Sequence, residues 1–311
     1  MKKSISVIIS ALNEEESLNE LYEGIEASFK KDFKDFEREY IFINDGSTDG
    51  TLDVLKKLRE KSKAVKIISF RRRLGKATAL NEGFKKAKGE IIITMDADLQ
   101  DGPENFPILY EKLNNHFDLV VGWKKKRHDS LGKVIPSKLF NLLVRKLSKV
   151  KLHDLNSGFK IMRKEVTQEL HLYGELHRFI PVLAFQQGFK IAEVPVIHHP
   201  RKYGKSKYRL GPRLRGNFDF LTVLFLESYG ERPLHLFGIL GLLGIFIGII
   251  LGIYLTILHF QGVVISRRPL LILAVLLIVA GLQLFSTGLI GEMIVSRFKR
   301  GEKLPIEYET E

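Results

Sequence analysis

The chain has 311 residues, a formal net charge of +13 at pH 7 and no cysteine. A chain of this length is expected to form about two domains with an ample core. The lack of cysteine excludes disulfide bonds and thiolate metal sites, and it is compatible with a reducing compartment.

The N-terminal third of the chain alternates between apolar runs and amphipathic segments. Four alternations of strand and helix are typical of a Rossmann-like α/β fold with a mostly parallel sheet and right-handed crossovers. The carboxyl ends of parallel strands meet at one edge, so we expect the loops that carry Asn13, Asp45 and Asp96 to lie together there. The predicted strands are 4–9, 40–43, 65–70 and 91–95, and the predicted helices are 15–31, one from about 51, and 76–88.

The stretch from 91 to 107 reads IIITMDADLQDGPENFP and passes abruptly from a buried strand to acidic residues. Asp96 and Asp98 flank Ala97, and Gln100 follows two positions later, so these side chains can point the same way in an extended loop. Three oxygen ligands without a thiolate suit Mg²⁺ or Mn²⁺. The alternative is a solvated acidic turn, but acids at the carboxyl end of a buried strand favour the metal site.

Two basic segments lie further along, because Asp129 is the only acid between Leu119 and His153 and none occurs between Val194 and Phe218. Such segments can bind nucleic acid, anionic lipid or a phosphorylated substrate. The apolar spans described below favour the last two over nucleic acid. For any single lysine, a solvated anchor beside a membrane is the alternative.

The first basic segment contains an amphipathic stretch, 136–149, with apolar residues on one helical arc and Lys and Arg on the other. This pattern predicts an interfacial helix, although a soluble helix packed on the domain would look similar. Arg127 and Lys138 precede or open this helix, and both are candidates for binding an acceptor phosphate.

The second basic segment is a glycine-containing arm with Arg201, Lys205 and Lys207. Because Lys and Arg neutralise phosphate oxygens, this arm can close over a diphosphate as a lid. Upstream, His177 and Arg178 open an apolar helix. They are either a satisfied pair at a helix end or a substrate contact, and we favour Arg178 over His177 as the contact.

Two long C-terminal segments, 233–266 and 269–291, contain no Asp, Glu, Lys or Arg. Each is long enough for a bilayer core of roughly 30 Å, and a soluble core helix of that length nearly always has a polar stripe. Two transmembrane helices are therefore predicted, with 217–229 lying along the membrane before the first. The connecting turn holds only Arg267 and Arg268, whereas more basic residues flank the other ends, so both termini are expected in the cytoplasm. No signal peptide is indicated.

We therefore expect three parts: a domain over 1–210, a juxtamembrane helix over 211–232, and a two-helix membrane region with a short cytoplasmic tail over 233–311. Six motifs between Ser4 and Gly211 resemble those of one enzyme family: LNEEESL, INDGSTDGT, LGKATALNEGFKKAKGEIIITMDADLQDGPE, HDLNSGFKIMRKEV, LHRFIPVLAFQQGFKIAEVPV and HHPRKYGKSKYRLG. Their order and spacing are similar to those of the membrane-tethered polyprenyl-phosphate glycosyltransferases of family 2, which have the GT-A fold and include dolichol-phosphate mannose synthase and bactoprenol glucosyltransferase.

The resemblance implies an enzyme that moves a hexose, glucose or mannose, from a UDP- or GDP-sugar to undecaprenyl or dolichyl phosphate at the cytoplasmic membrane face, with inversion. It also implies that the Asn13 and Asp45 loops hold the base and ribose, and that Asp96, Asp98 and Gln100 hold Mg²⁺ or Mn²⁺ on the diphosphate, Asp98 being catalytic. The donor-binding residues that it implies are Ala11, Leu12, Asn13, Glu14, Asp45, Lys76, Asp96, Ala97, Arg178, Arg201, Lys205 and Lys207. The resemblance does not indicate the base, because Ser10 and Asn44 depart from the family pattern.

By the same resemblance, Asp154 is a catalytic residue in the segment that approaches the reacting sugar, with an Asx turn before a strand as the alternative. A hydroxyl acceptor needs its proton removed. A phosphate acceptor, with a second pKa of about 6, arrives mostly deprotonated. We therefore expect Asp154 chiefly to orient the donor sugar or the cationic groups that bind the phosphate.

Three rival functions are open to test. A processive polysaccharide synthase would carry a Gln-x-x-Arg-Trp element, but the only tryptophan, Trp123, lies in Val-Gly-Trp-Lys. A catalytically silent membrane scaffold is disfavoured by the intact acids. A nucleotidyltransferase should have a glycine-rich loop near the N-terminus, and 10–14 contains no glycine. The sequence leaves a homo-oligomer possible.

Overall fold

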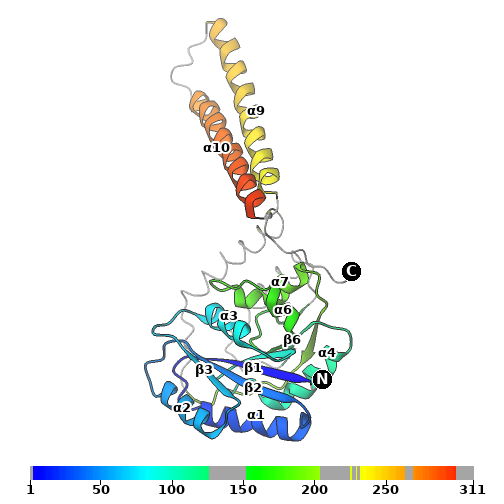
Figure 1. Cartoon of the computed structure of the whole chain (residues 1–311). Coiled ribbons are helices and arrows are strands. Elements are labelled where there is room, and N and C mark those ends of the chain that lie inside the picture. Colours follow the sequence, from blue (N-terminus) through cyan, green and yellow to red (C-terminus); the bar gives the residue numbers. More distant parts are fainter. Residues whose placement is uncertain are drawn as a thin grey trace. The chain divides into compact units, whose positions relative to one another are not determined.

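The computed structural model describes residues 3–125, 152–203, 225, 229, 232–262 and 269–298, with side chains up to residue 295. The chain divides into two compact units, Met1–Phe220 and Leu221–Glu311 (Figure 1). Several sequence predictions lie outside the described residues: the interfacial helix 136–149, most of the juxtamembrane segment 211–232, and the candidate phosphate-binding residues Arg127, Lys138, Lys205 and Lys207.

The described part of the first unit contains a seven-stranded sheet in the order β3-β2-β1-β4-β6-β5-β7. Neighbouring strands among the first four are parallel, which confirms the mostly parallel sheet. β6 runs antiparallel to both of its neighbours, whereas β5 and β7 are parallel. The strands are β1 Ser4–Ala11, β2 Glu37–Asn44, β3 Val65–Ser69, β4 Ile91–Asp96, β5 Leu119–Trp123, β6 Lys160–Arg163 and β7 Ile191–Pro195.

Helices cover both faces of this sheet (Figure 1). One face packs its Val7 and Phe42 side chains in a single core cluster with Phe29 of α1, Leu55 of α2 and Leu109 of α4. On the other face, α3 lies so close that a Cβ added to Gly83 would be 2.6 Å from the side chain of Ile8. The helices are α1 Leu18–Asp32, α2 Thr51–Lys61, α3 Lys76–Lys86, α4 Phe106–Asn114, α6 Lys164–Glu169 and α7 Ile180–Gln186, with 3₁₀ turns η1 Pro103–Asn105 and η2 Leu176–Phe179.

Two helix boundaries differ from the prediction because loops bind their neighbours. α1 begins at Leu18 rather than at residue 15, since the backbone N–H of Glu14 donates to Thr51 Oγ1 and the Glu15 carboxylate accepts from Gly50 N. α3 ends at Lys86 rather than at residue 88, because the next backbone N–H groups donate to side chains of β1 and β2. In both places, hydrogen bonds to neighbouring segments hold the chain in a non-helical course just beyond the end of the helix.

The carboxyl ends of β1, β2 and β4 lie level with one another. Ala11 pairs with Asn44, and Ser10 pairs with Asp96. The backbone N–H of Asp45 also donates to the carbonyl of Ala11 at 2.9 Å. The predicted meeting of these three strand ends at one edge is thus confirmed.

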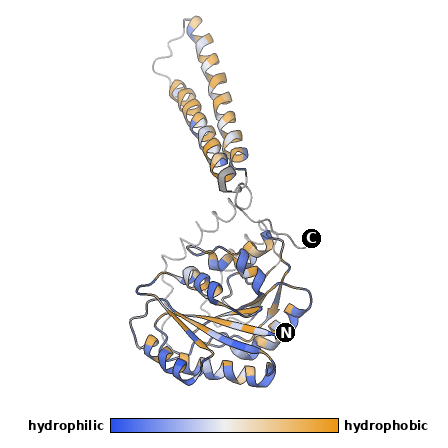
Figure 2. Ribbon diagram, in the orientation of Figure 1, coloured by the Kyte–Doolittle hydropathy of each residue, from blue (hydrophilic) through white to orange (hydrophobic). Residues whose placement is uncertain are grey.

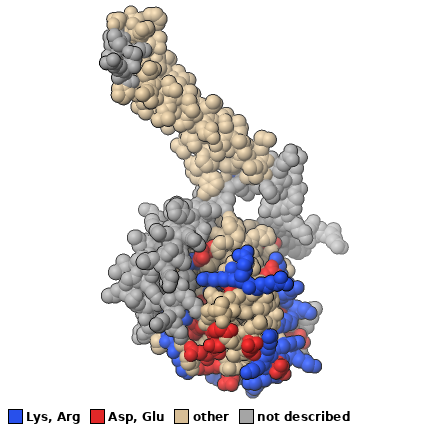
Figure 3. Space-filling view, turned by 90° about the vertical axis from the view of Figure 1, so that its left-hand side faces the viewer, with Lys and Arg blue, Asp and Glu red and all other residues tan. Residues whose placement is uncertain are grey.

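The second unit is a pair of long helices, α9 Pro233–Phe260 and α10 Pro269–Phe298. Figure 2 shows that both are apolar on nearly every face, and Figure 3 shows no charged side chain on the visible face of either. Their most apolar 18-residue windows have mean hydropathies of 2.8 and 2.5, and only 17% and 11% of those windows are buried. Both helices are therefore long and apolar enough to cross a membrane, and unlike core helices they expose their apolar residues.

Glycines line the contact between α9 and α10. A Cβ on Gly241 would lie 2.5 Å from the carbonyl oxygen of Gly281, and a Cβ on Gly281 would lie 2.5 Å from that of Gly241. At Gly248, a Cβ would come within 2.8 Å of the carbonyl oxygen of Ala274. By contrast, nothing lies within 4 Å of a Cβ on Gly252. The helices approach at their backbones along this glycine seam (Gly241, Gly248, Gly281), as small residues allow.

Candidate active site

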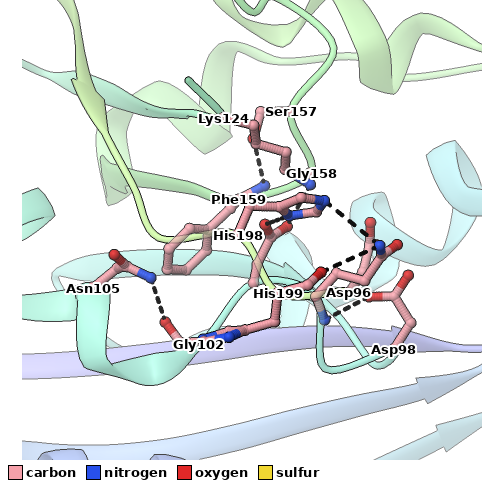
Figure 4. Close-up of polar contacts among 12 residues, drawn as sticks. Asp96, Asp98, Gly102, Asn105, Lys124, Ser157, Gly158, Phe159, His198 and His199 are labelled. Atoms are coloured by element: carbon pink, nitrogen blue, oxygen red, sulfur yellow. Dashed lines mark hydrogen bonds and ion pairs between the residues drawn. The ribbon is translucent and has the colours of Figure 1, made fainter. Parts of the chain in front are cut away.

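Asp96 is the last residue of β4, and the loop that follows turns back at Leu99, which has a φ of 60°. This turn lets the backbone N–H of Gln100 donate to Asp98 Oδ1 at 3.2 Å. Ala97 is buried between the two acids. In Figure 4, Asp96 and Asp98 lie close to Gly158, His198 and His199. The loop thus presents two carboxyl groups at the edge of the sheet.

Each of these carboxyl groups is paired with a cationic side chain. Lys76, the first residue of α3, forms an ion pair with Asp96, and Arg201 forms one with Asp98. Burial acts to raise the pKa of Asp96, but the charge of Lys76, the hydrogen bond from Lys76 and the charge of Lys124 together outweigh it, and the pKa lies below its ordinary value. Burial and the charge of Asp96 together raise the pKa of Asp98. The two neighbouring acids therefore differ in how firmly they hold a proton.

Gln100 faces the segment that leads to Arg201. Its amide nitrogen lies 3.5 Å from His198 Nε2 and 3.5 Å from the carbonyl oxygen of His199. The backbone N–H of His199 donates to the carbonyl of Gln100 at 2.8 Å, and the His199 ring lies 2.7 Å from Glu104 Oε1. These contacts fix the 198–201 segment along the acidic loop. Arg201 thereby also comes within 3.9 Å of Glu14.

The loop after β1 is bound to the loop after β2. Asn13, with a φ of 51°, donates its backbone N–H to Ser47 Oγ at 2.9 Å and accepts from the backbone N–H of Thr48 at 2.8 Å. The backbone N–H of Glu14 donates to Thr51 Oγ1 at 2.9 Å. Leu12 connects Asn13 to Ala11 at the end of β1. The two loops thus form one hydrogen-bonded rim beside Asp96.

Asp45 is 5% exposed and accepts from the backbone N–H groups of Leu74 and Gly75, at 2.7 and 3.1 Å from Oδ1. A Cβ on Gly46 would lie 2.4 Å from the backbone carbon of Arg72, so the two loops touch at their backbones. The positive φ of 98° at Gly75 then starts α3. Asp45 therefore fixes the position from which Lys76 reaches Asp96.

The loop before β6 closes the site from the other side. A Cβ on Gly158 would lie 2.6 Å from Asp96 Oδ2, and Thr94 Oγ1 donates to the carbonyl of Gly158 at 3.0 Å. Asp154 is 1% exposed and Lys160 is 2% exposed. Lys160 donates to the carbonyl of Ser157, and burial, then the charge of Lys76, lower the pKa of Lys160 to about 7.

Sequence reasoning missed a buried group formed by Asp101, Lys124 and His198. Lys124 Nζ lies 2.9 Å from Asp101 Oδ2, and His198 Nδ1 lies 3.2 Å from Asp101 Oδ1. Burial acts to lower the pKa of Lys124, but the charge and hydrogen bond of Asp101, together with the charges of Asp96 and Asp154, outweigh it and raise the pKa. The charges of Asp96 and Asp154 act on Lys124 as well, so this group belongs to the same site. A lysine directly after the largely apolar strand β5 was the available signal.

η2 places the two candidate residues His177 and Arg178 differently. Arg178 Nη2 forms an ion pair with Glu175 at 2.8 Å. His177 is 7% exposed and is subject to the charges of Lys76, Lys160 and Asp96. Of the residues expected at the donor site, the structure therefore brings Glu14, Lys76, Asp96, Asp98 and Arg201 together through direct contacts.

Comparisons with known proteins identify the family of the chain. The family model described as Glycosyl transferase family 2 matches residues 6–171, which is more than half of the chain. Dodecaprenyl-phosphate galacturonate synthase of Rhizobium johnstonii is 37% identical over 308 residues, which cover 97% of this chain and 90% of that protein. Undecaprenyl-phosphate 4-deoxy-4-formamido-L-arabinose transferase of Pseudomonas paraeruginosa is 32% identical over 293 residues, covering 93% and 84%.

Among solved structures, glucosyl-3-phosphoglycerate synthase from Mycobacterium tuberculosis, in complex with Mn²⁺ and UDP-glucose, is similar with a TM-score of 0.54. The identity is 22%, and the match covers 72% of this chain and 79% of that one. At this level the likeness concerns the fold of the sheet domain. Taken with the family match and the two relatives, the chain belongs to glycosyl transferase family 2 and is a glycosyltransferase of GT-A fold.

Proposed function

We propose that this enzyme transfers a sugar from a nucleoside diphosphate sugar to a polyprenyl phosphate at a membrane surface. The observation that carries the proposal is that two relatives named for dodecaprenyl and undecaprenyl phosphate match this chain over 97% and 93% of its length. Matches of that extent include much of the apolar α9 and α10. A lipid phosphate stays at the membrane while a sugar nucleotide arrives from water, so an enzyme that joins them needs both a soluble site and a membrane anchor.

The acidic loop suits a divalent cation. The carboxylates of Asp96 and Asp98 are neighbours, and each forms an ion pair, with Lys76 and with Arg201. These two carboxylates therefore already bind positively charged groups. Among the described residues, no three His, Cys, Asp or Glu side chains form a complete metal site. Mg²⁺ and Mn²⁺ do not need one, since one or two carboxylates with waters and substrate phosphates suffice. Asp96 and Asp98 would hold the cation, with Gln100 beside them, and the bound cation would supply Lewis-acid stabilisation of the leaving diphosphate.

The chain's own cationic groups would act on the same charge. Lys76 and Arg201 contact the carboxylates in this structure, and both can turn to oxygens of the donor diphosphate. Their charge would then balance that which develops on the leaving nucleoside diphosphate. Asp154 lies buried in the loop that closes the site. Its charge acts on the pKa values of Lys124 and Lys160. Its proposed role is to orient the sugar and these cations for attack by the acceptor phosphate.

The test is a panel assay with purified enzyme, Mg²⁺ or Mn²⁺ and a short polyprenyl phosphate. The donors are UDP-glucose and GDP-mannose, which the resemblance suggests, together with UDP-galacturonate and UDP-4-deoxy-4-formamido-L-arabinose, whose sugars are named in the relatives. The expected result is one glycolipid with release of the matching nucleoside diphosphate. Turnover of none of these donors in either metal would contradict the proposal and favour a catalytically silent scaffold.

Orientation in the membrane is a further part of the proposal. The turn between the spans holds two basic residues, Arg267 and Arg268, whereas the chain before the first span and after the second is richer in Lys and Arg. The positive-inside tendency therefore favours cytoplasmic termini. Because the chain has no native cysteine, Gln261→Cys and Thr310→Cys provide a clean test. Only the first should react with an impermeant maleimide in intact cells, and the reverse pattern would overturn the orientation.

A further inference from the structure

His177 is a buried histidine that the proposed reaction has not yet used. It lies in η2, is 7% exposed, and its Nδ1 has no hydrogen-bond partner within the described part of the chain. Buried polar atoms are rarely left without a partner in folded proteins. An orphaned imidazole nitrogen inside an enzyme site therefore points to a bound ligand as the missing partner.

The position of His177 is fixed from the side of α3. The side chain of Asn81 in α3 accepts from the backbone N–H of Leu172 at 3.2 Å and donates to the Leu172 carbonyl. η2 then packs against α3 a few residues later. The charges of Lys76, Lys160 and Asp96 all act on the imidazole. His177 thus lies within the electrostatic reach of the charged residues around the end of β4, on a turn that packs against α3.

The chemistry of the orphaned atom follows from the groups around the ring. Burial, and then the charges of Lys76 and Arg178, lower the pKa of His177 well below its ordinary value, so the ring is neutral. A neutral imidazole has one donor and one acceptor nitrogen. Nε2 lies 4.0 Å from Glu175 Oε2, and a carboxylate there favours the proton on Nε2. Nδ1 is then a lone-pair acceptor, and its partner must be a donor.

We propose that Nδ1 of His177 accepts a hydrogen bond from a hydroxyl group of the donor sugar, which makes His177 a sugar-binding residue. The inference rests on the proposed function. Of the groups that the reaction brings to this end of β4, the donor diphosphate and the dianionic acceptor phosphate offer no hydrogen-bond donor at neutral pH. The ribose hydroxyls are expected at the Asn13 and Asp45 loops. The hydroxyls of the transferred sugar are the donors that remain.

Two amide substitutions separate the two ring nitrogens. The amide of Asn places a polar atom close to the position of Nδ1, whereas the longer Gln places it close to that of Nε2. The probes are the sugar nucleotide that the panel assay shows to be turned over, and UDP or GDP alone as the same ligand without the sugar. Binding is measured by calorimetry with the short polyprenyl phosphate omitted, so that the readout is independent of turnover.

His177→Gln is expected to weaken binding of the sugar nucleotide about tenfold while leaving the affinity for the nucleoside diphosphate unchanged, the size expected for one hydrogen bond. His177→Asn should stay within about threefold of wild type for both ligands. His171→Gln is the matched control, because His171 is exposed and lies two residues after the end of α6 and five before the start of η2, and it should change neither affinity. Thermal unfolding of each variant shows whether it is folded.

Three results would overturn the inference. Equal weakening of the sugar nucleotide and the nucleoside diphosphate by His177→Gln would assign the residue to the diphosphate region or to Lys76. No weakening in a folded His177→Gln protein would remove it from the site. If His177→Asn lost as much affinity for the sugar nucleotide as His177→Gln, the sugar would not be bound at the position of Nδ1. If no donor in the panel is turned over, the proposed function fails and this inference falls with it, which the first assay reports separately.

Discussion

The carboxyl edge of the sheet is held together in two different ways on its two sides. In the loops after β1 and β2, side-chain oxygens accept from backbone N–H groups, as Asn13 does from Thr48 and Asp45 does from Leu74 and Gly75. In the loops after β4 and before β6, acids meet charged side chains instead, as Asp96 meets Lys76 and Asp98 meets Arg201. We call the first the amide-bonded rim and the second the charged floor.

This difference indicates that substrates rearrange the contacts of the charged floor and not those of the amide-bonded rim. The amide-bonded rim satisfies its polar groups within the chain, so it is complete before any ligand arrives. The charged floor instead brings opposite charges together in a partly buried space and shifts pKa values in opposite directions at Asp96 and Asp98. Perturbed groups of this kind cluster at functional sites. Substitutions in the floor should therefore change activity, and substitutions in the rim should first change stability.

The largest expected effect is that of Asp98→Ala in the floor. Losing a carboxylate that would hold the cation removes leaving-group stabilisation of several kcal/mol, so kcat should fall about a thousandfold. The melting temperature should hardly change, because the substitution also removes a carboxyl group whose burial is unfavourable. Activity is measured as release of the nucleoside diphosphate across a Mn²⁺ titration.

Asp53→Ala is the matched control for this experiment, since Asp53 lies on α2 with its side chain 76% exposed. It should keep wild-type turnover. Full activity of Asp98→Ala in excess chelator would show that no cation works at this loop.

Asp154→Asn should have the next largest effect, a fall in kcat of about a hundredfold through lost positioning. Because the acceptor phosphate itself loses its second proton near pH 6, the ascending limb of the pH profile should persist in the variant. The measurement is the pH dependence of kcat from pH 5 to 8. A limb present in the wild type and lost in Asp154→Asn would identify Asp154 as the general base.

Asp45→Ala tests the rim, and its expected effect on kcat is smaller. It leaves the backbone N–H groups of Leu74 and Gly75 without their acceptor, which should cost about 2 kcal/mol of folding free energy. Thermal unfolding in detergent should show a melting temperature lower by several degrees, with the donor KM raised more than kcat is lowered. If the melting temperature were unchanged and the activity as low as that of Asp98→Ala, Asp45 would act in the reaction rather than in stabilising the loops.

The buried charge of Lys160 should make the stability of the fold depend on pH, without a change in the contacts that it makes. Its pKa in the folded protein is lowered to about 7 from an ordinary value of 10.5. Below pH 7 both the folded and the unfolded protein carry this charge. Between pH 7 and 10.5 the unfolded protein binds more protons, so the folded state gains stability as pH rises through this window.

Lys160→Met has no such titration. Its melting temperature should therefore exceed that of the wild type most at pH 6.5, and the gap should narrow by pH 9. Lys160→Arg is the control, because arginine stays charged throughout this pH range. The difference in melting temperature between Lys160→Met and Lys160→Arg should therefore stay the same from pH 6.5 to 9. A constant gap between Lys160→Met and wild type would show that Lys160 keeps its proton in the folded protein.

The sequence was sufficient to predict that the loops after β1, β2 and β4 meet at one edge of the sheet. Continuous apolar runs marked β1, β2 and β4, and parallel strands bring their carboxyl ends together whatever the details of packing. Asp96, Asp98 and Asp45 follow such runs directly, so their common edge could be predicted. The acids at these strand ends also lie within motifs that resemble those of the family.

The rest of the floor depends on contacts that no local pattern contains. Asp101, Lys124 and His198 are far apart in the chain and meet because β6 inserts antiparallel between β4 and β5, with β7 beside β5. Arg178 pairs with Glu175, three residues earlier at the start of the same short turn, whereas η2 as a whole packs against α3. A short 3₁₀ turn gives no periodicity from which side-chain directions can be predicted.

The glycine seam between α9 and α10 has a consequence for how this chain can change over generations. Every missense change in a glycine codon adds at least a β-carbon, and at Gly241, Gly248 and Gly281 that atom would meet backbone of the facing helix. These codons therefore have no neutral missense neighbours. The outward residues, such as Leu242 and Ile249, are exposed and can exchange among apolar types. Drift in this hairpin is thus confined to its outer surface, and the inner line remains fixed while the rest diverges.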